Sequence, residues 1–192
     1  MRVFDALPGV GAVVVTVGDR AAPLVYGQAT RHLRVGVGAH RVVVARGPRI
    51  LARGVVRTSA ADPSATVVLA PGDAGGVRVA AFRDAPPADL ANARLRVLHA
   101  QPLAGRLDLD VVGGSALARG LRPLRATPYE PIDDALARPC MGAAHVDIRR
   151  AGRVIKRSVL TLDPGNAYTA FAIRPHRSPP GAVKLVIVRD GR

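Results

Sequence analysis

Polar and apolar residues alternate along several short stretches of the chain. The alternation is clearest at 106–111, with the sequence RLDLDV, and it recurs at 32–35, with HLRV. A period of two puts one face of a strand on a core and the other face in water. Further strands are expected at 12–17, 41–45, 53–57, 66–69, 144–149, 154–162 and 167–173. Short strands that recur about every 8 to 12 residues, with turn residues between them, predict a β-sandwich or barrel.

The chain also contains an internal repeat. The segment RVFDALP, which begins at Arg2, resembles RVLHAQP, which begins at Arg96, and VAAFRD, which ends at Asp84, resembles LVIVRD, which ends at Asp190. The offset between the copies grows from 94 to 106 positions, so the second copy holds a net insertion of about 12 residues. We place it near 126–142, where prolines and polar residues predict an irregular connection, with one helical turn left open at 132–137.

These patterns predict an all-β protein made of two tandem β-sandwich domains. The first repeat spans 1–85, a Pro-rich linker spans 86–93, and the second repeat spans 94–192. A chain of 192 residues fits two sandwiches of about 90 to 100 residues each. Pro86 and Pro87 remove backbone donors, so the linker is expected to be short and stiff.

The composition predicts an aliphatic core and a strongly basic surface. Apolar residues make up 48% of the chain, but there are no Trp, three Phe and three Tyr. The formal net charge is +14, almost all of it from Arg, because Lys156 and Lys184 are the only lysines. Such a charge attracts polyanions at low salt, although a genome rich in G and C would produce the same Arg excess without selection for binding. No apolar run approaches the ~18 to 20 residues of a membrane span.

Two expected hairpins carry clusters of basic residues. Arg149, Arg150, Arg153, Lys156 and Arg157 surround the turn at Ala151-Gly152. Arg41, Arg46, Arg49, Arg53 and Arg57 surround Gly47-Pro48 at the corresponding place in the first copy. Two such patches could engage one polyanion bivalently, with strong salt dependence. The alternative is that these arginines are simply exposed, and nucleic acid is not expected as a partner because interleaved aromatic residues are absent.

The other chemically interesting residues have structural interpretations. Tyr168 follows a Pro-Gly corner, where its hydroxyl can bond back to the loop backbone, although a ligand-stacking role is an alternative. Asp108 and Asp110 lie on the same face of one strand. This face is expected to be exposed to solvent, and the alternative is that the two carboxylates bind a cation. Cys140 has no partner for a disulfide and is expected to be a small buried residue. The histidines lack metal-ligand spacing, and no nucleotide-binding or nucleophile motif is present, so we expect no metal, no cofactor and no catalytic residue.

The second copy also resembles a known family. The motifs are RVLHAQP at 96–102, LDLD at 107–110, VDIR at 146–149 and LDPGNAYT at 162–169, and they are similar to the bacterial domain-of-unknown-function family 4397. In the first copy, Asp5 stands where the family would have His, and Thr66 falls near the place of Tyr168. The resemblance implies an immunoglobulin-like sandwich, usually exported or displayed at the cell surface, with no established activity, cofactor or catalytic residue.

These observations together predict a non-enzymatic tandem module that is structural, adhesive or ligand-presenting at the bacterial cell envelope. Its expected partner is an anionic cell-envelope polymer or another protein, and the alternative function is polyanion binding through the two Arg-rich hairpins. The chain begins directly with a strand-like segment and shows no signal-peptide pattern, so a cytoplasmic location stays open unless a signal has been removed.

Overall fold

The computed structural model describes residues 1–61, 64–72, 75–84, 92–132 and 144–190. Its contacts divide the chain into two compact units, Met1–Ala85 and Pro86–Arg192. Among the described residues, the secondary structure consists of strands and one short 3-10 helix, η1 (Pro102–Ala104). The predicted linker at 86–93 and the possible helical turn at 132–137 fall largely outside the described residues.

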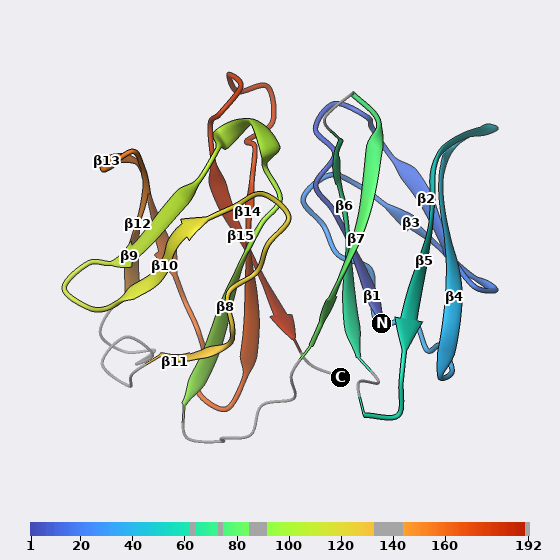
Figure 1. The fold of residues 1–192 in the computed structure, drawn as a ribbon, viewed down its shortest axis with the longest axis horizontal. Coiled ribbons are helices and arrows are strands. Elements are labelled where there is room, and N and C mark those ends of the chain that lie inside the picture. The colour runs from blue at the N-terminus through green and yellow to red at the C-terminus, as the bar shows by residue number, and fades with distance from the viewer. Residues whose placement is uncertain (62–63, 73–74, 85–91, 133–143, 191–192) are drawn as a thin grey trace. The chain divides into compact units, whose positions relative to one another are not determined.

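The first unit is a sandwich of two sheets (Figure 1). One sheet has the strand order β1-β6-β7, and the other has the order β3-β2-β4-β5. Their bounds are β1 (Arg2–Asp5), β2 (Val13–Val17), β3 (Arg20–Leu24), β4 (Gly38–Arg46), β5 (Arg49–Thr58), β6 (Ala65–Pro71) and β7 (Val77–Arg83). Strand β1 pairs with β6 in parallel, and the other neighbours are antiparallel.

The second unit has the same plan with one additional edge strand. Its sheets have the orders β11-β8-β14-β15 and β10-β9-β12-β13. Their bounds are β8 (Ala93–His99), β9 (Leu107–Val111), β10 (Ala116–Leu121), β11 (Glu130–Ile132), β12 (Ala144–Arg150), β13 (Arg153–Leu160), β14 (Ala167–Ile173) and β15 (Lys184–Asp190). Again, the first strand, β8, pairs in parallel with the penultimate one, β14. The prediction of an all-β protein with sandwich sheets is confirmed.

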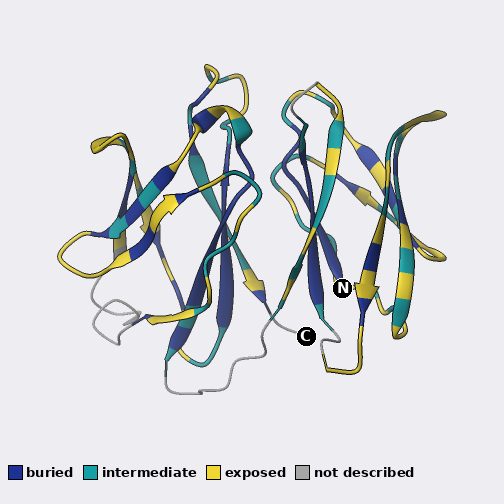
Figure 2. Cartoon of the chain, viewed as in Figure 1, coloured by how far each residue is buried: buried dark blue, intermediate teal, exposed yellow. Residues whose placement is uncertain are grey.

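Each unit has its own hydrophobic core, built mainly from aliphatic side chains. In β2 the residues Val13, Val15 and Val17 are buried, whereas Val14 between them is 45% exposed. Strand β9 repeats this pattern with Leu107, Leu109 and Val111 buried. Burying one such side chain contributes about 1.5–3 kcal/mol, so the period of two fixes which face turns inward. Figure 2 shows this alternation along strands such as β5 and β9, whereas β1, β6, β8 and β14 are buried along almost their whole length.

The strand registers of the two units correspond. Val15 pairs with Val44 in the first unit, and Leu109 pairs with Ile148 in the second, so β2 and β4 match β9 and β12. Likewise Arg2 lies opposite Thr66, and Arg96 lies opposite Thr169, so β1 and β6 match β8 and β14. Thr66 therefore takes the place of Thr169, one residue from the expected match with Tyr168.

The additional length of the second unit is spread over several connections. The difference in residue number between a residue of the second unit and its match in the first unit grows along the chain. It is 94 at Leu109, 97 at Ala126, 104 at Ile148 and 106 in β15. The β9–β10 hairpin and the β14–β15 loop each hold three additional residues, seven lie between Ala126 and Ile148, and the β13–β14 connection is one residue shorter. The interval near 126–142 therefore accounts for the largest part of the insertion, but not for all of it.

The prediction of a strand at 32–35 is wrong, because this segment forms no named strand. Leu33 is joined to Met1 by two backbone hydrogen bonds: its N–H donates to Met1 O at 2.6 Å, and the Met1 amino group donates to Leu33 O at 3.0 Å. Leu33 and Val35 still pack against the first core, partly buried. The alternation therefore identified the inward-facing side chains, although the pairing is too short to make a strand.

The second unit has β11 at the equivalent place. Glu130 pairs with Leu95, as Leu33 is joined to Met1, and β8 provides two further partners, Arg94 and Ala93, for the rest of β11. The edge strand is therefore an extended version of a contact that both units share.

Candidate functional site

The two basic hairpins predicted from the sequence occupy equivalent positions in the two units. Arg46 pairs with Arg49 beside the Gly47-Pro48 turn, and Arg150 pairs with Arg153 beside the Ala151-Gly152 turn. Each hairpin also has a register shift just before its turn. Gly47 has φ +54°, while Ala151 and Gly152 both have positive φ, the conformations that tight hairpin turns require. Arg53 and Arg157 also match, because Arg53 lies opposite Val43 on β4 and Arg157 lies opposite Asp147 at the equivalent position of β12.

Two arginines of the second basic hairpin, Arg149 and Arg157, are held in ion pairs. Arg157 donates two hydrogen bonds to Asp147, from Nε at 2.7 Å and from Nη2 at 3.1 Å. The hydrogen bonds from Arg157 hold the pKa of the Asp147 carboxyl below its ordinary value. Arg149 Nε lies 3.2 Å from Asp110 Oδ2, and Arg119 also forms an ion pair with Asp110. The outer face of this sheet is therefore close to electrically balanced.

The same face of the first unit has no such balance. The register places Val43 where the second unit has Asp147, and Thr16 where it has Asp110. Three arginines of this outer face, Arg41, Arg53 and Arg57, are exposed, and within the described part of the chain none of them has an acidic partner. The two hairpins are thus alike in backbone, but the arginines on the outer faces of their sheets are paired with acids only in the second unit.

The arginines of the first unit surround an exposed apolar residue. Arg41 on β4 lies directly opposite Val55 on β5, and Arg53 and Arg57 flank Val55 on the same strand face. Val55 is 65% exposed. We call this surface, Arg41, Arg53, Arg57 and Val55, the first-unit basic face. Arg46 and Arg49 are also exposed and lie beyond it, at the hairpin turn.

Tyr168 connects the start of β14 to the preceding loop. Its hydroxyl accepts a hydrogen bond from the backbone N–H of Asp163 at 3.0 Å and donates one to Asp163 Oδ2 at 3.2 Å. The ring belongs to the second core, and burial raises the pKa of the hydroxyl. This geometry fits the structural role, which stays a prediction.

His99 and Asp5 occupy the same place in the two units and make the same local contact. His99 Nδ1 accepts a hydrogen bond from Gln101 N at 3.2 Å, and Asp5 Oδ1 accepts one from Leu7 N at 2.8 Å. His99 Nε2 also contacts Gly105 O at 2.7 Å, whereas Asp5 Oδ2 is buried without a partner in the described residues. Burial lowers the pKa of His99 and raises that of Asp5 to about 6.

Sequence reasoning missed a polar cluster that is repeated in both units. Arg96 Nε donates to Thr169 Oγ1 at 2.9 Å, and the Thr169 hydroxyl donates to Asp190, which lies 2.7 Å away at Oδ2. In the first unit, Arg2 Nε donates to Thr66 Oγ1 at 2.9 Å, and the Thr66 hydroxyl donates to Asp84 at 2.7 Å.

These arginine–threonine–aspartate clusters explain why the repeat was detectable. Arg2 and Arg96 begin the matching first segments, and Asp84 and Asp190 end the matching last segments. The cluster could have been found from the sequence, because the same charged residue recurs at the same point of two otherwise apolar segments. Each cluster links the first strand of a unit to its last strand through the threonine between them. In the second unit, Tyr129 extends the cluster by donating to Asp190 Oδ2 at 2.7 Å.

The remaining candidates form no further site in the described residues. Asp110 is paired with arginines, and Asp108 accepts a hydrogen bond from Gly120 N at 2.6 Å. Groups of three or more His, Cys, Asp or Glu residues that could hold a metal ion are absent from the described part of the chain. Cys140 and the pair Asp133-Asp134 lie outside it. The described residues also include no helix long and apolar enough to cross a membrane.

The strand plan and its repeated clusters define an all-β protein of two sandwich units that share one topology. The family model described as "Domain of unknown function (DUF4397)" matches residues 1–110, and the chain belongs to this family. The matched residues contain the first unit and only the beginning of the second, up to β9, although we expected the second copy to carry the resemblance best. No curated protein matches the chain.

Proposed function

We propose that this protein is a non-enzymatic tandem β-sandwich module with a structural, adhesive or ligand-presenting role at the bacterial cell envelope. One observation supports this most directly: the polar side chains best suited to catalysis or ligand binding form hydrogen bonds that stabilise the fold. His99 contacts backbone groups on both sides, Tyr168 fastens a loop, and Asp190 completes a strand-linking cluster. The proposed location follows from family membership, because the resemblance implies domains that are exported or displayed.

The location can be tested with the native protein in its source bacterium. We expect immunodetection to find the chain in the envelope fraction or the medium, and protease added to intact cells to degrade it. A cytoplasmic enzyme measured in the same fractions controls for lysis. Recovery of the intact chain together with this marker, protected from external protease, would overturn the proposal.

We also propose a second function, polyanion binding by the first-unit basic face. It is favoured by the difference between the two units: the second unit neutralises its outer face with Asp110 and Asp147, and the first does not. Unpaired guanidinium groups are good partners for phosphate and sulfate groups, which they can bind with two parallel hydrogen bonds. The proposal therefore differs from the bivalent arrangement expected from the sequence, since Asp110 and Asp147 neutralise the corresponding outer face of the second unit.

The spacing of the arginines favours a linear polymer over a single small anion. Arg53 and Arg57 are four residues apart on one strand, about 13 Å by strand geometry, and Arg41 lies between them on the neighbouring strand. A single phosphate cannot bridge this distance, whereas successive groups of a flexible polymer can. Binding should fall steeply with salt, because each neutralised group releases counterions.

The matched unit supplies the test. Thr16→Asp together with Val43→Asp installs the acids of the second unit opposite Arg53, and we expect polyphosphate binding to weaken by about tenfold or more at low salt. Two changes of the same charge, Ser115→Asp and Gly114→Asp in the β9–β10 turn, form the control and should have a smaller effect. The reciprocal pair Asp110→Thr and Asp147→Val should strengthen binding. If the first-unit variant binds polyphosphate as the unmodified chain does, this second function is excluded.

A further inference from the structure

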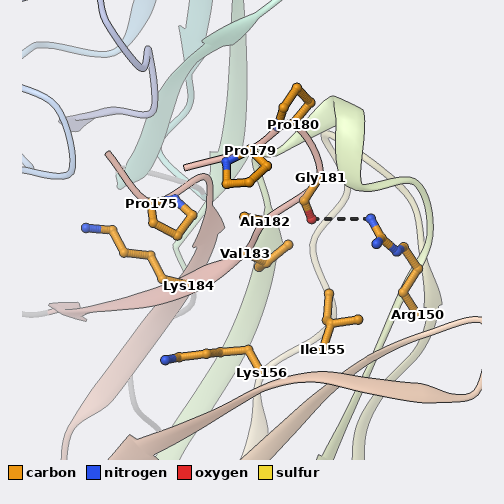
Figure 3. A pocket seen from close by; sticks show the side chains of 10 residues that line it. All are labelled: Arg150, Ile155, Lys156, Pro175, Pro179, Pro180, Gly181, Ala182, Val183 and Lys184. Atoms are coloured by element: carbon orange, nitrogen blue, oxygen red, sulfur yellow. Dashed lines mark hydrogen bonds between the residues drawn. The ribbon is translucent and has the colours of Figure 1, made fainter. Parts of the chain in front are cut away.

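A second, independent feature is a pocket confined to the second unit. It lies between the β12–β13 hairpin and the loop that joins β14 to β15, and its cavity volume is about 510 Å³ (Figure 3). Its lining consists of Arg150, Ile155, Lys156, Pro175, Pro179, Pro180, Gly181, Ala182, Val183 and Lys184. Binding sites for small molecules typically have volumes of about 300–1,000 Å³, so a small organic ligand would fit.

The wall formed by the β14–β15 loop is fixed by hydrogen bonds. Ser178 N donates to Pro175 O at 3.3 Å, and Ala182 N donates to Pro179 O at 3.2 Å. Arg174 Nε donates to Ser178 O at 2.7 Å, which closes the loop from its other side. The prolines restrict the backbone further because their rings fix φ. The pocket is therefore formed before any ligand arrives, and binding need not order the loop.

Gly181 allows the β14–β15 loop to pack closely against the β12–β13 hairpin. Arg150 Nη1 donates to Gly181 O at 3.3 Å, and a Cβ atom added at position 181 would lie 2.6 Å from that nitrogen. Gly181 also has φ +84°, which other residues rarely adopt. Glycine thus allows the arginine to approach closely and keeps the two sides of the pocket together.

The charged residues of the pocket are all basic. The only two lysines of the chain, Lys156 and Lys184, line it from different strands, and Arg150 is the third basic residue. None of the ten lining residues is acidic. Figure 3 shows the two lysine side chains extending in the same direction on one side of the pocket, with Arg150 on the other side. Ile155, Val183 and the prolines provide an apolar surface between them.

The first unit does not repeat this arrangement. The register places Ala52 where the second unit has Lys156, and the loop that matches 174–183 is three residues shorter, with no Pro-Pro pair in its sequence. A feature that the shared strand plan does not require, and that gathers both lysines, indicates a specific role for the second unit.

We propose that this pocket binds a small organic carboxylate, with the carboxylate at Lys156 and Lys184 and an apolar body against the prolines, Ile155 and Val183. Two ammonium groups provide donors for a carboxylate, and the proline rings provide an apolar surface for an aromatic or aliphatic body. This site is separate from the first-unit basic face and takes a monomeric ligand instead of a polymer.

The experiment uses the full chain and 2-naphthoate as the probe, followed by amide chemical-shift changes in NMR spectra. We expect a dissociation constant of about 1 mM or lower and shifts concentrated at Ile155, Ala182, Val183 and Lys184. Lys156→Gln and Lys184→Gln should each weaken binding about fivefold. Arg153→Gln removes the same charge from the hairpin outside the pocket lining and should leave the affinity nearly unchanged.

Two comparison ligands separate recognition from nonspecific attraction. The uncharged 2-naphthalenemethanol and the small anion acetate should both bind at least about fivefold more weakly than 2-naphthoate. Equal weakening by Arg153→Gln and by the lysine variants, equal binding of the uncharged analogue, or no binding at all would each overturn the proposal. Gly181→Ala, which pushes Arg150 away, should also weaken binding, and its folding can be checked in the same spectra.

Discussion

Asp5 and His99 show how one position can carry opposite responses to pH. Both lie at the end of the first strand of a unit, and both accept a hydrogen bond from the backbone two residues later. Burial favours the neutral form of each, so the pKa of Asp5 rises from 3.8 to about 6 and that of His99 falls below 6.5. Asp5 therefore stabilises the fold less as the pH rises through 6, while His99 stabilises it less as the pH falls below 6.5.

The Asp5 effect can be measured with Asp5→Asn. The amide keeps an acceptor for Leu7 N and carries no charge, so the variant should gain about 1–2 kcal/mol in free energy of unfolding at pH 7.5. Near pH 4 the gain should vanish, because folded Asp5 is then already protonated. Native-state hydrogen exchange of β1 and β6 amides at both pH values measures the difference. Asp19→Asn, at a side chain that is 83% exposed, is the control, and an equal gain at both pH values would contradict the explanation.

At the scale of elements, the parallel pairing of the first and penultimate strands is reinforced by side chains. In the second unit, Thr169 lies between Arg96 on β8 and Asp190 on β15 and bonds to both. The cluster thus connects three adjacent strands of one sheet across their ladder. Because the same three residue types recur in the first unit, the connection belongs to the shared plan of the fold.

Thr169→Val tests this connection. Valine has nearly the same shape, but without the hydroxyl it leaves Arg96 Nε and Asp190 each without one partner, which should cost about 1–3 kcal/mol. We expect faster hydrogen exchange in β8, β14 and β15. Thr16→Val, on the outer face of β2, should change stability by less than about 0.5 kcal/mol. A Thr169 variant as stable as this control would show that the cluster contributes nothing to the fold.

At the scale of the whole molecule, the chain contains two cores that share no residue. The first core is built from residues between Met1 and Val79, and the second from residues between Ala93 and Ile187. Damage to one core should therefore be felt mainly within its own unit. The two cores are nevertheless equivalent in plan, since Val15 and Leu109 occupy matching inward positions.

Leu109→Ala should remove buried contacts and cost the second unit about 2–5 kcal/mol. Hydrogen exchange should accelerate in β8 to β15 and much less in β1 to β7. Val15→Ala should produce the reverse distribution with a smaller cost, since valine loses fewer atoms. Equal acceleration throughout the chain in both variants would show that the units unfold as one.

Much of the fold could be predicted because its cause is local. The alternation at 107–111 specifies which side chains turn inward, and the two RD endings at Asp84 and Asp190 revealed the repeat. The segment at 32–35 shows the limit of this reasoning. Its pattern predicted burial correctly, but a strand also needs a partner of sufficient length, and the pattern of one segment says nothing about its neighbour.

The candidate sites depended on contacts that no local pattern contains. The sequence by itself determined the all-β class, the repeat and the positions of the basic hairpins, because these follow from side-chain period, turn residues and charge. Only the tertiary structure decided which arginines are neutralised, since the β9–β12 pairing brings Asp110 next to Asp147 and Arg149. It likewise brought Lys156 and Lys184 to one pocket. Electrostatic balance and cavities depend on distances in space, which separation along the chain does not fix.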